Sequence, residues 1–131
     1  MQELVIEQTE FSPKVNFNPT TGKFEISGES RPENTGKFYA RIISWVEEFQ
    51  AHLQNNAFTS PLIFEFKFDY FNSTSAKFIL DFLRQLEVVQ IENADLKIII
   101  HWHFDKRDED MKESGEEFSH LVQLPFEFIA Y

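Results

Sequence analysis

The chain lacks cysteine altogether, and its 131 residues include only 4 glycines. Without cysteine there can be no disulfide bond, thiol nucleophile, iron–sulfur cluster or cysteine-ligated zinc site. The sequence contains neither a glycine-rich phosphate-binding loop nor the G-x-S-x-G turn of serine hydrolases. Its apolar runs are a few residues long, whereas a membrane-spanning helix needs roughly 20. These absences exclude several common classes of enzyme and a transmembrane protein.

Positive charge is also scarce. Lys and Arg number 12 against 22 Asp and Glu, which gives a formal net charge of −10. Such a charge repels phosphate backbones and anionic lipid surfaces, so we expect neither nucleic-acid nor membrane binding. The first residues carry acidic groups and no basic segment followed by a long apolar one, so we expect no secretory signal. The composition favours an acidic protein of the cytoplasm.

Apolar residues alternate with polar ones in four segments, the pattern typical of strands. Residues 15–28 predict a hairpin, with turn-forming residues in its middle, and 62–69, 97–104 and 126–130 predict single strands. Two of these single strands, 62–69 and 97–104, have one apolar face and one mixed face. A strand buried between two layers of helices is usually apolar on both faces, so we expect helices mainly on one face of the sheet.

Apolar residues spaced three or four apart predict helices over 34–54 and 73–91, and the acidic segment beginning at Asp105 is helix-prone. Residues 1–12 show neither pattern, and we expect them to form a loose lead-in. The predicted order is β-β-α-β-α-β-α-β. This order indicates an α/β fold: a single two-layer domain over residues 1–131 with a mixed sheet, partly parallel because helices connect most strands.

Three groups of residues suggest chemistry. A hydroxyl of Ser73 or Ser75 could form a triad with His101, but serine at a helix start is more commonly a cap. His101 and His103 lie on one face of a strand, at a spacing that suits a metal. Two partly exposed histidines on an open sheet face are the interpretation we prefer, so we expect no metal or cofactor. The acidic run after Asp105 lacks the pattern of a calcium-binding loop.

The segment NSTSAK, residues 72–77, lies between a strand and a helix. Hydroxyl groups at a helix start lie among free backbone N–H groups and the positive end of the helix dipole, where a phosphate is stabilised. Lys77 lies about one turn after Ser73 and could pair with a phosphate there. From the residues alone, simple capping of the helix by Asn72 and its neighbours remains the favoured interpretation.

At these residues the sequence resembles the SiaC-type bacterial regulatory phosphoproteins, and the resemblance runs from about Ser12 to Phe128. The landmarks share their order and spacing with that family: GKFEISG at 22–28, Ser30-x-Pro32-Glu33-Asn34, Phe38-Tyr39, Trp45-Val46-Glu47, YFNSTSxK at 70–77, HWHFD at 101–105, Glu116-Glu117-Phe118 and Leu124-Pro125-Phe126. The resemblance implies a fold like that of STAS domains, the anti-sigma-factor antagonists. It also implies a protein that is not an enzyme.

Proteins of this family are substrates of a dedicated Ser/Thr kinase and a PP2C-type phosphatase. The resemblance implies that the unphosphorylated form binds and activates a partner, in the best-known case a diguanylate cyclase that makes cyclic di-GMP. The usual motif is Asn-Thr-Ser-Ser-x-Lys with the first Thr phosphorylated, and Ser73 occupies that position here. Since this chain has Ser-Thr-Ser, Thr74 is an alternative acceptor, and Asn72, Ser75 and Lys77 surround the site.

The surface that contacts the partner is less defined by the sequence. Aromatic and charged side chains anchor protein interfaces, and the candidates, if they are exposed, are Tyr39, Tyr70, Phe71, Arg31 and Glu33. For Tyr70 and Phe71, a place in the core at the end of a strand is an equal alternative. Two other functions stay open. One is an antagonist of the same fold in another partner-switching pathway, such as sigma-factor or stress control. The other is a metal-dependent hydrolase that uses the paired histidines at 101 and 103.

Overall fold

The structure, a computed structural model, describes residues 1–58 and 60–131. These residues form six strands and three helices in the order β-β-β-α-β-α-β-α-β. The bounds are β1 Leu4–Ile6, β2 Lys14–Asn18, β3 Lys23–Ser30, α1 Thr35–Leu53, β4 Leu62–Phe71, α2 Ser73–Glu92, β5 Ile98–Phe104, α3 Glu109–Leu121 and β6 Phe126–Ala130. None of the helices in this part of the chain is long and apolar enough to cross a bilayer.

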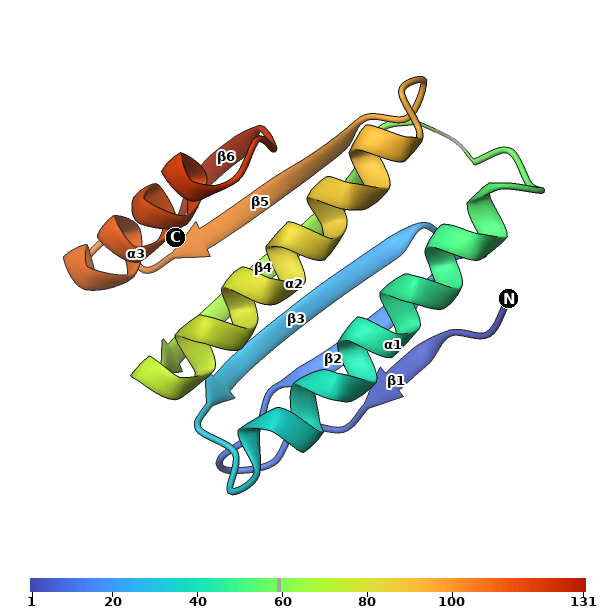
Figure 1. The fold of residues 1–131 in the computed structure, drawn as a ribbon. Coiled ribbons are helices and arrows are strands. Elements are labelled where there is room, and N and C mark those ends of the chain that lie inside the picture. The colour runs from blue at the N-terminus through green and yellow to red at the C-terminus, as the bar shows by residue number, and fades with distance from the viewer. Residues whose placement is uncertain (59) are drawn as a thin grey trace.

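The strands form one mixed sheet whose spatial order, β1-β2-β3-β4-β5-β6, follows the chain (Figure 1). Strands β1, β2 and β3 are antiparallel neighbours, whereas β3, β4, β5 and β6 run parallel to one another. The parallel half follows from the helical connections, since each helix returns the chain to the end of the sheet where the next strand begins. The predicted mixed sheet of a single α/β domain is confirmed. The likeness to STAS domains stays a prediction.

The segment 1–12 is not the loose lead-in that the sequence predicts. Its Leu4–Ile6 run forms β1, which pairs with β2 in antiparallel register, with Val5 opposite Asn16. The indole N–H of Trp45 on α1 also donates to the carbonyl oxygen of Gln2 at 3.1 Å. Three apolar residues are too few to show a periodicity, and only the open edge of β2 gives them a partner. Three strands, not the predicted two, therefore precede the first helix.

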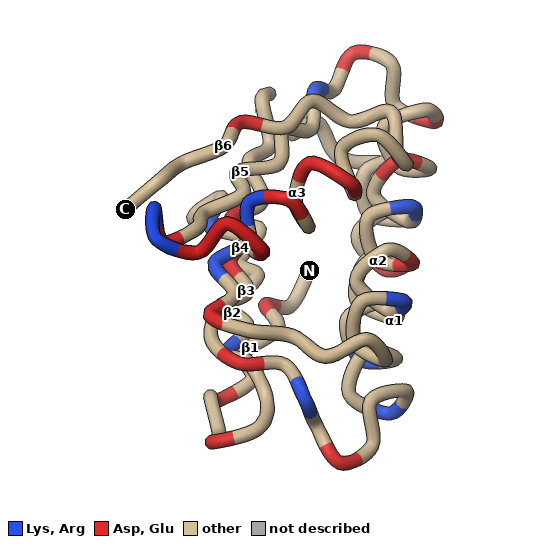
Figure 2. The backbone as a smooth tube through the Cα atoms, turned by 90° about the vertical axis from the view of Figure 1, so that its left-hand side faces the viewer, with Lys and Arg blue, Asp and Glu red and all other residues tan. Residues whose placement is uncertain are grey.

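All three helices lie against the same face of the sheet, so the molecule has two layers (Figures 1 and 2). Ring contacts join the layers: Phe66 of β4 packs on Phe82 of α2 at 5.3 Å, and Trp102 of β5 packs on Phe118 of α3 at 5.6 Å. The alternation along β4 places Phe64, Phe66 and Phe68 in this core. The other face carries the polar residues of the same strands, and no helix of the described residues covers it.

Helix boundaries follow from their caps. Asn34 caps α1 by accepting a hydrogen bond from the backbone N–H of Lys37 at 3.0 Å. The third helix begins at Glu109, later than predicted, because Asp108 accepts from the backbone N–H of Met111 at 3.0 Å and caps it there. Residues 105–108, which are Asp-Lys-Arg-Asp, precede this helix and are not part of it.

Candidate functional site

Strands β3 and β4 end side by side, and α2 starts directly after β4. Glu29 lies opposite Tyr70 and Ser30 opposite Phe71 in parallel register. The backbone N–H of Asn72 donates to the carbonyl oxygen of Ser30 at 3.2 Å, which fixes the start of α2 to β3. The first residues of α2 therefore lie at the carboxyl ends of two central strands, the edge where open α/β sheets commonly bind their ligands.

The start of α2 presents two hydroxyl groups to solvent. Asn72 caps the helix, with its side-chain oxygen accepting from the backbone N–H of Ser75 at 2.8 Å. Ser73 and Thr74 are the first two helical residues, and both are exposed. A phosphoryl group on either would lie at the positive end of the helix dipole. Lys77 is exposed one turn along the helix, where its ammonium group can add to this positive potential.

Ser75 points into the protein. It is fully buried, and its hydroxyl donates to the carbonyl oxygen of Ser30 at 2.9 Å and accepts from the hydroxyl of Ser30 at 2.9 Å. The Ser30 hydroxyl also lies 2.7 Å from that of Tyr39. This chain of three hydroxyl groups ties α1, β3 and α2 together directly beneath Ser73. Because Ser75 is enclosed, it supports the exposed hydroxyl groups and is out of reach of a kinase in this conformation.

Tyr39 is not available as a partner contact, contrary to the sequence prediction. Its exposed fraction is 0%, and burial raises the pKa of its phenol, an effect that the hydrogen bond with Ser30 partly opposes. Its ring stacks on that of Phe78 with 5.9 Å between centroids. Position 39 falls on the buried stripe of α1, which includes Ile42 and Val46, and the tyrosine belongs to the core for that reason.

The other predicted partner residues lie around Ser73. Tyr70 is 47% exposed, whereas Phe71 is half-buried with its ring 6.0 Å from that of Phe118. Arg31 and Glu33 are exposed in the connection between β3 and α1. The guanidinium group of Arg31 pairs with Glu29 at 2.6 Å and lies 4.3 Å above the ring of Phe11. Tyr70, Arg31 and Glu33 therefore form an exposed rim at this end of the sheet.

A groove of about 530 Å³ lies between α1 and α2. Gly36 and Phe78 line it near the start of both helices, and Ile43 and Val88 add apolar surface further along. Sequence analysis missed this groove. Two large apolar residues outside the buried stripes of their helices, Ile43 and Val88, could have indicated an apolar surface between the helices. Val88 is 39% exposed. Phe78 is five residues after Ser73 on α2, and neither Ser73 nor Thr74 lines the groove.

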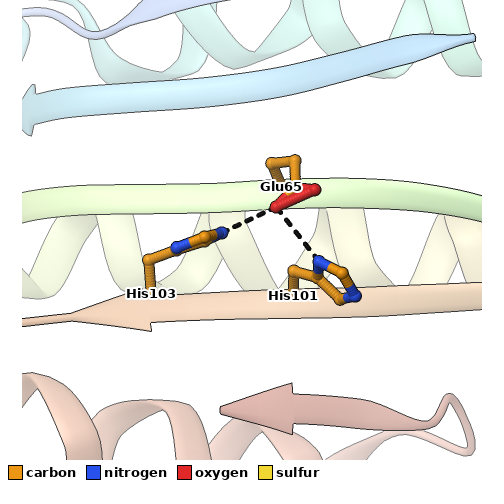
Figure 3. Close-up of side chains that lie close together, drawn as sticks. All are labelled: Glu65, His101 and His103. Carbon is orange, nitrogen blue, oxygen red and sulfur yellow. Dashed lines mark hydrogen bonds and ion pairs between the residues drawn. The ribbon is translucent and has the colours of Figure 1, made fainter. Parts of the chain in front are cut away.

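The two histidines of β5 lie on the open face, as predicted, and the fold adds two glutamates to them. The side chain of Glu65 on β4 meets His101 and His103, as Figure 3 shows. Its Oε1 atom is 2.6 Å from Nε2 of His103 and 3.2 Å from Nδ1 of His101. Nε2 of His101 is 2.9 Å from an oxygen of Glu127 on β6. No serine of the described residues hydrogen-bonds to either histidine, and Ser75 is bonded to Ser30 instead, so the structure does not assemble the triad considered above.

The acidic run before α3 has structural partners. In Figure 2, positions of Asp and Glu (red) and of Lys and Arg (blue) follow one another along the backbone where α3 begins. The carboxylate of Asp105 accepts two hydrogen bonds from the Arg107 side chain, at 3.0 and 2.8 Å, and these bonds lower the pKa of Asp105 to about 2. Asp108 is the cap of the helix. Asp105 and Asp108 thus have structural roles in the turn that leads into α3.

Comparison with known proteins identifies the family. A model of the family described as SiaC family regulatory phosphoprotein matches residues 6–131. A protein of Pseudomonas aeruginosa strain UCBPP-PA14, named only as uncharacterized, is 30% identical over 131 residues, which is 100% of this chain and 98% of that protein.

Solved structures agree with the family match. The crystal structure of apo-SiaC from Pseudomonas aeruginosa superposes with a TM-score of 0.85 at 30% identity, covering 99% of this chain and 100% of that one. Another similar solved structure is the crystal structure of the diguanylate cyclase SiaD in complex with its activator SiaC, from the same organism. Its matching chain gives a TM-score of 0.85 at 30% identity and covers 98% of this chain and 99% of its own.

Proposed function

Because this chain belongs to the SiaC family of regulatory phosphoproteins, we propose that it is a non-enzymatic switch protein of the cytoplasm. Its unphosphorylated form binds and regulates a diguanylate cyclase, and phosphorylation of Ser73 by a cognate Ser/Thr kinase ends this binding. A PP2C-type phosphatase restores the binding form. The observation that carries the proposal is the exposed hydroxyl of Ser73 at the start of α2, surrounded by residues suited to a protein interface.

Phosphorylation would act through local charge. A phosphoryl group adds about −1.5 to −2 charges at neutral pH. The start of α2 and the side chain of Lys77 stabilise this charge in the free protein, so the domain need not unfold or rearrange. A partner that covers Ser73 would have to bury the same charge and would lose binding energy. The hydroxyl chain through Ser75 and Ser30 keeps the helix start in place in both forms.

The surface for the cyclase would combine the exposed rim of Tyr70, Arg31 and Glu33 with the groove between α1 and α2. The rim provides an aromatic anchor and both signs of charge, which favours a specific contact. The groove provides apolar area for a segment of the cyclase, and its near end lies beside Phe78. A phosphoryl group on Ser73 would add its charge at the start of α2, the helix that forms one wall of the groove, and would oppose a partner that covers this end of the sheet.

The first test is phosphorylation itself. With the cognate kinase and ATP, we expect the intact mass to increase by one phosphoryl group, and treatment with the PP2C-type phosphatase to remove it. Ser73→Ala should abolish the increase, whereas the matched variant Thr74→Ala should keep it. If Thr74→Ala loses the group and Ser73→Ala keeps it, the acceptor is Thr74 and the assignment to Ser73 is wrong. If the double variant Ser73→Ala/Thr74→Ala keeps the group, the switch lies elsewhere in the chain.

The second test is binding to the cyclase. We expect Ser73→Ala to bind the cyclase as tightly as the unmodified protein does. Ser73→Asp should bind about tenfold or more weakly, because it places a negative charge at the interface. The effect should be smaller than that of phosphorylation, since a carboxylate carries only part of the charge of a phosphoryl group. Calorimetric titration of each variant with the purified cyclase measures this difference. Equal affinities for both variants would contradict the mechanism. Phosphorylation without any binding to the cyclase would instead favour the alternative of another partner-switching pathway.

A further inference from the structure

The open face of the sheet brings together residues from three strands that are distant in the sequence. In the parallel registers of β4, β5 and β6, Glu65 lies opposite His101 and His101 opposite Glu127. His103 follows His101 on the same face, since side chains two apart along a strand point the same way. The side chains of Glu65, His101 and His103 are each about one-fifth exposed, at 26%, 18% and 15%. They are thus held by the sheet but remain accessible to small ions.

Both imidazole rings are directed at one carboxylate oxygen (Figure 3). Oε1 of Glu65 is 2.6 Å from Nε2 of His103 and 3.2 Å from Nδ1 of His101, and the three residues offer ligand atoms that all lie within 4.8 Å of one another. In a tetrahedral zinc site, bonds of about 2.0–2.1 Å place neighbouring ligand atoms about 3.3 Å apart. Small side-chain movements would therefore convert this cluster into three ligands of one ion.

We propose that Glu65, His101 and His103 bind a divalent transition-metal ion of the zinc class. The two nitrogen donors favour Zn²⁺ and its neighbours over Mg²⁺ or Ca²⁺, which prefer oxygen. Three protein ligands leave a coordination position open to water, as in zinc sites that are not purely structural. The proposal concerns binding alone and does not depend on phosphorylation of Ser73, which lies at the end of the sheet on the helix side.

Glu127 serves as a positioning residue for this site. Its carboxylate lies 2.9 Å from Nε2 of His101, so Nε2 can donate its hydrogen to Glu127 and leave the lone pair of Nδ1 directed toward Glu65. Metal-binding histidines almost always donate their second N–H in this way, and the contact fixes both the ring orientation and the tautomer. Two surface histidines without a metal would not need this contact. The position of Glu127 on a third strand therefore supports a metal site.

The charges nearby are compatible with a bound cation. Lys67 is the cation that follows Glu65 on this face of β4, and it is paired with Glu25 at 2.9 Å. Glu25 on β3 is thus the ion-pair partner of Lys67 on this face of the sheet. Among the described residues, the Glu65 oxygen that faces the histidines makes its close contacts with them and not with Lys67. The net charge of −10 further raises the local concentration of cations.

Calorimetric titration of the metal-free full chain with zinc chloride tests the proposal. We expect one ion per chain, together with a higher melting temperature, because an ion that binds only the folded state stabilises it. Glu65→Gln and His103→Gln should each abolish this binding, and Glu127→Gln should weaken it by about 10–100-fold. Cobalt chloride provides a spectroscopic reading, since Co²⁺ bound by four ligands absorbs visible light much more strongly than the hydrated ion.

The controls are the two histidines outside the cluster. The chain has 4 histidines in all, and His52→Gln and His120→Gln remove the imidazoles on α1 and α3 while leaving the cluster intact. Both controls should bind zinc as the unmodified chain does. Circular dichroism confirms that each variant is folded, which is expected because the substitutions lie on an open face. The absence of binding, or binding that survives in Glu65→Gln and His103→Gln, would overturn the proposal.

Discussion

Trp102→Ala is expected to lower the free energy of unfolding by about 3–5 kcal/mol, the usual cost of truncating a buried aromatic residue. Trp102 is 1% exposed and lies where β4, β5 and α3 meet, with its ring next to those of Phe66, Phe68 and Phe118. The substitution leaves a cavity among rigid rings that cannot close around it. Unfolding in urea, followed by circular dichroism, measures the loss.

Phe128→Ala is the matched control. Phe128 is also an aromatic residue of the sheet, but it lies on the edge strand β6 and is 39% exposed. We expect this substitution to cost less than about 1 kcal/mol, because much of its apolar surface is already in contact with water. Comparable losses in Trp102→Ala and Phe128→Ala would show that the junction of β4, β5 and α3 is not the tightly packed core described above.

Most of the fold could be predicted because its elements carry their own periodicity. The alternation over 62–69 identifies the central strand and its two faces, and the apolar spacing after Ser73 identifies α2 to within one or two residues of its observed bounds. Elements whose structure depends on distant residues could not be predicted. β1 exists because the edge of β2 is available, and the alternation within a three-residue run is too short to detect.

The same distinction applies to the functional residues. The helix start at Ser73 could be predicted because residues of helix-capping types are adjacent there in the sequence, whereas phosphorylation of Ser73 stays a prediction from the family resemblance. The burial of Tyr39 depends on the exact phase of α1 against the sheet, and a shift of one residue along a helix turns a side chain by about 100°. Glu65 joins the histidines only through the register of two parallel strands, which local sequence does not determine.

The proposed phosphorylation site and the proposed metal site lie on different parts of the sheet. Ser73 and its neighbours depend on a helix start and on the ends of β3 and β4, whereas Glu65 and the histidines depend on the middle of β4 and β5. The two groups share no hydrogen bond among the described residues. Substitutions in one group should thus leave the other unchanged, as is usual for sites without shared partners. The phosphorylation and metal tests can be interpreted independently.

Gly115→Ala is expected to destabilise the protein although it replaces a glycine inside a helix. Gly115 lies in the middle of α3 against Trp102, and a Cβ atom at this position would be 2.4 Å from Cδ1 of the indole ring. The missing side chain lets the indole approach the helix backbone, where its N–H donates to the carbonyl oxygen of Met111 at 3.0 Å. The ring cannot retreat, because Phe66 and Phe118 pack against it.

Alanine in a helix is favoured over glycine by about 1 kcal/mol, while forcing an atom into a packed core costs about 1–3 kcal/mol and occasionally more. Since the contact at Gly115 is far shorter than van der Waals distance, we expect a cost near the upper end of this range and a net loss of about 2 kcal/mol in urea unfolding. Gly36→Ala separates the two effects. There a Cβ atom would lie 3.6 Å from the nearest ring atom of Phe78, an ordinary contact, so stability should stay constant or rise by up to about 1 kcal/mol. An equal gain in both variants would mean that Trp102 does not pack directly on α3.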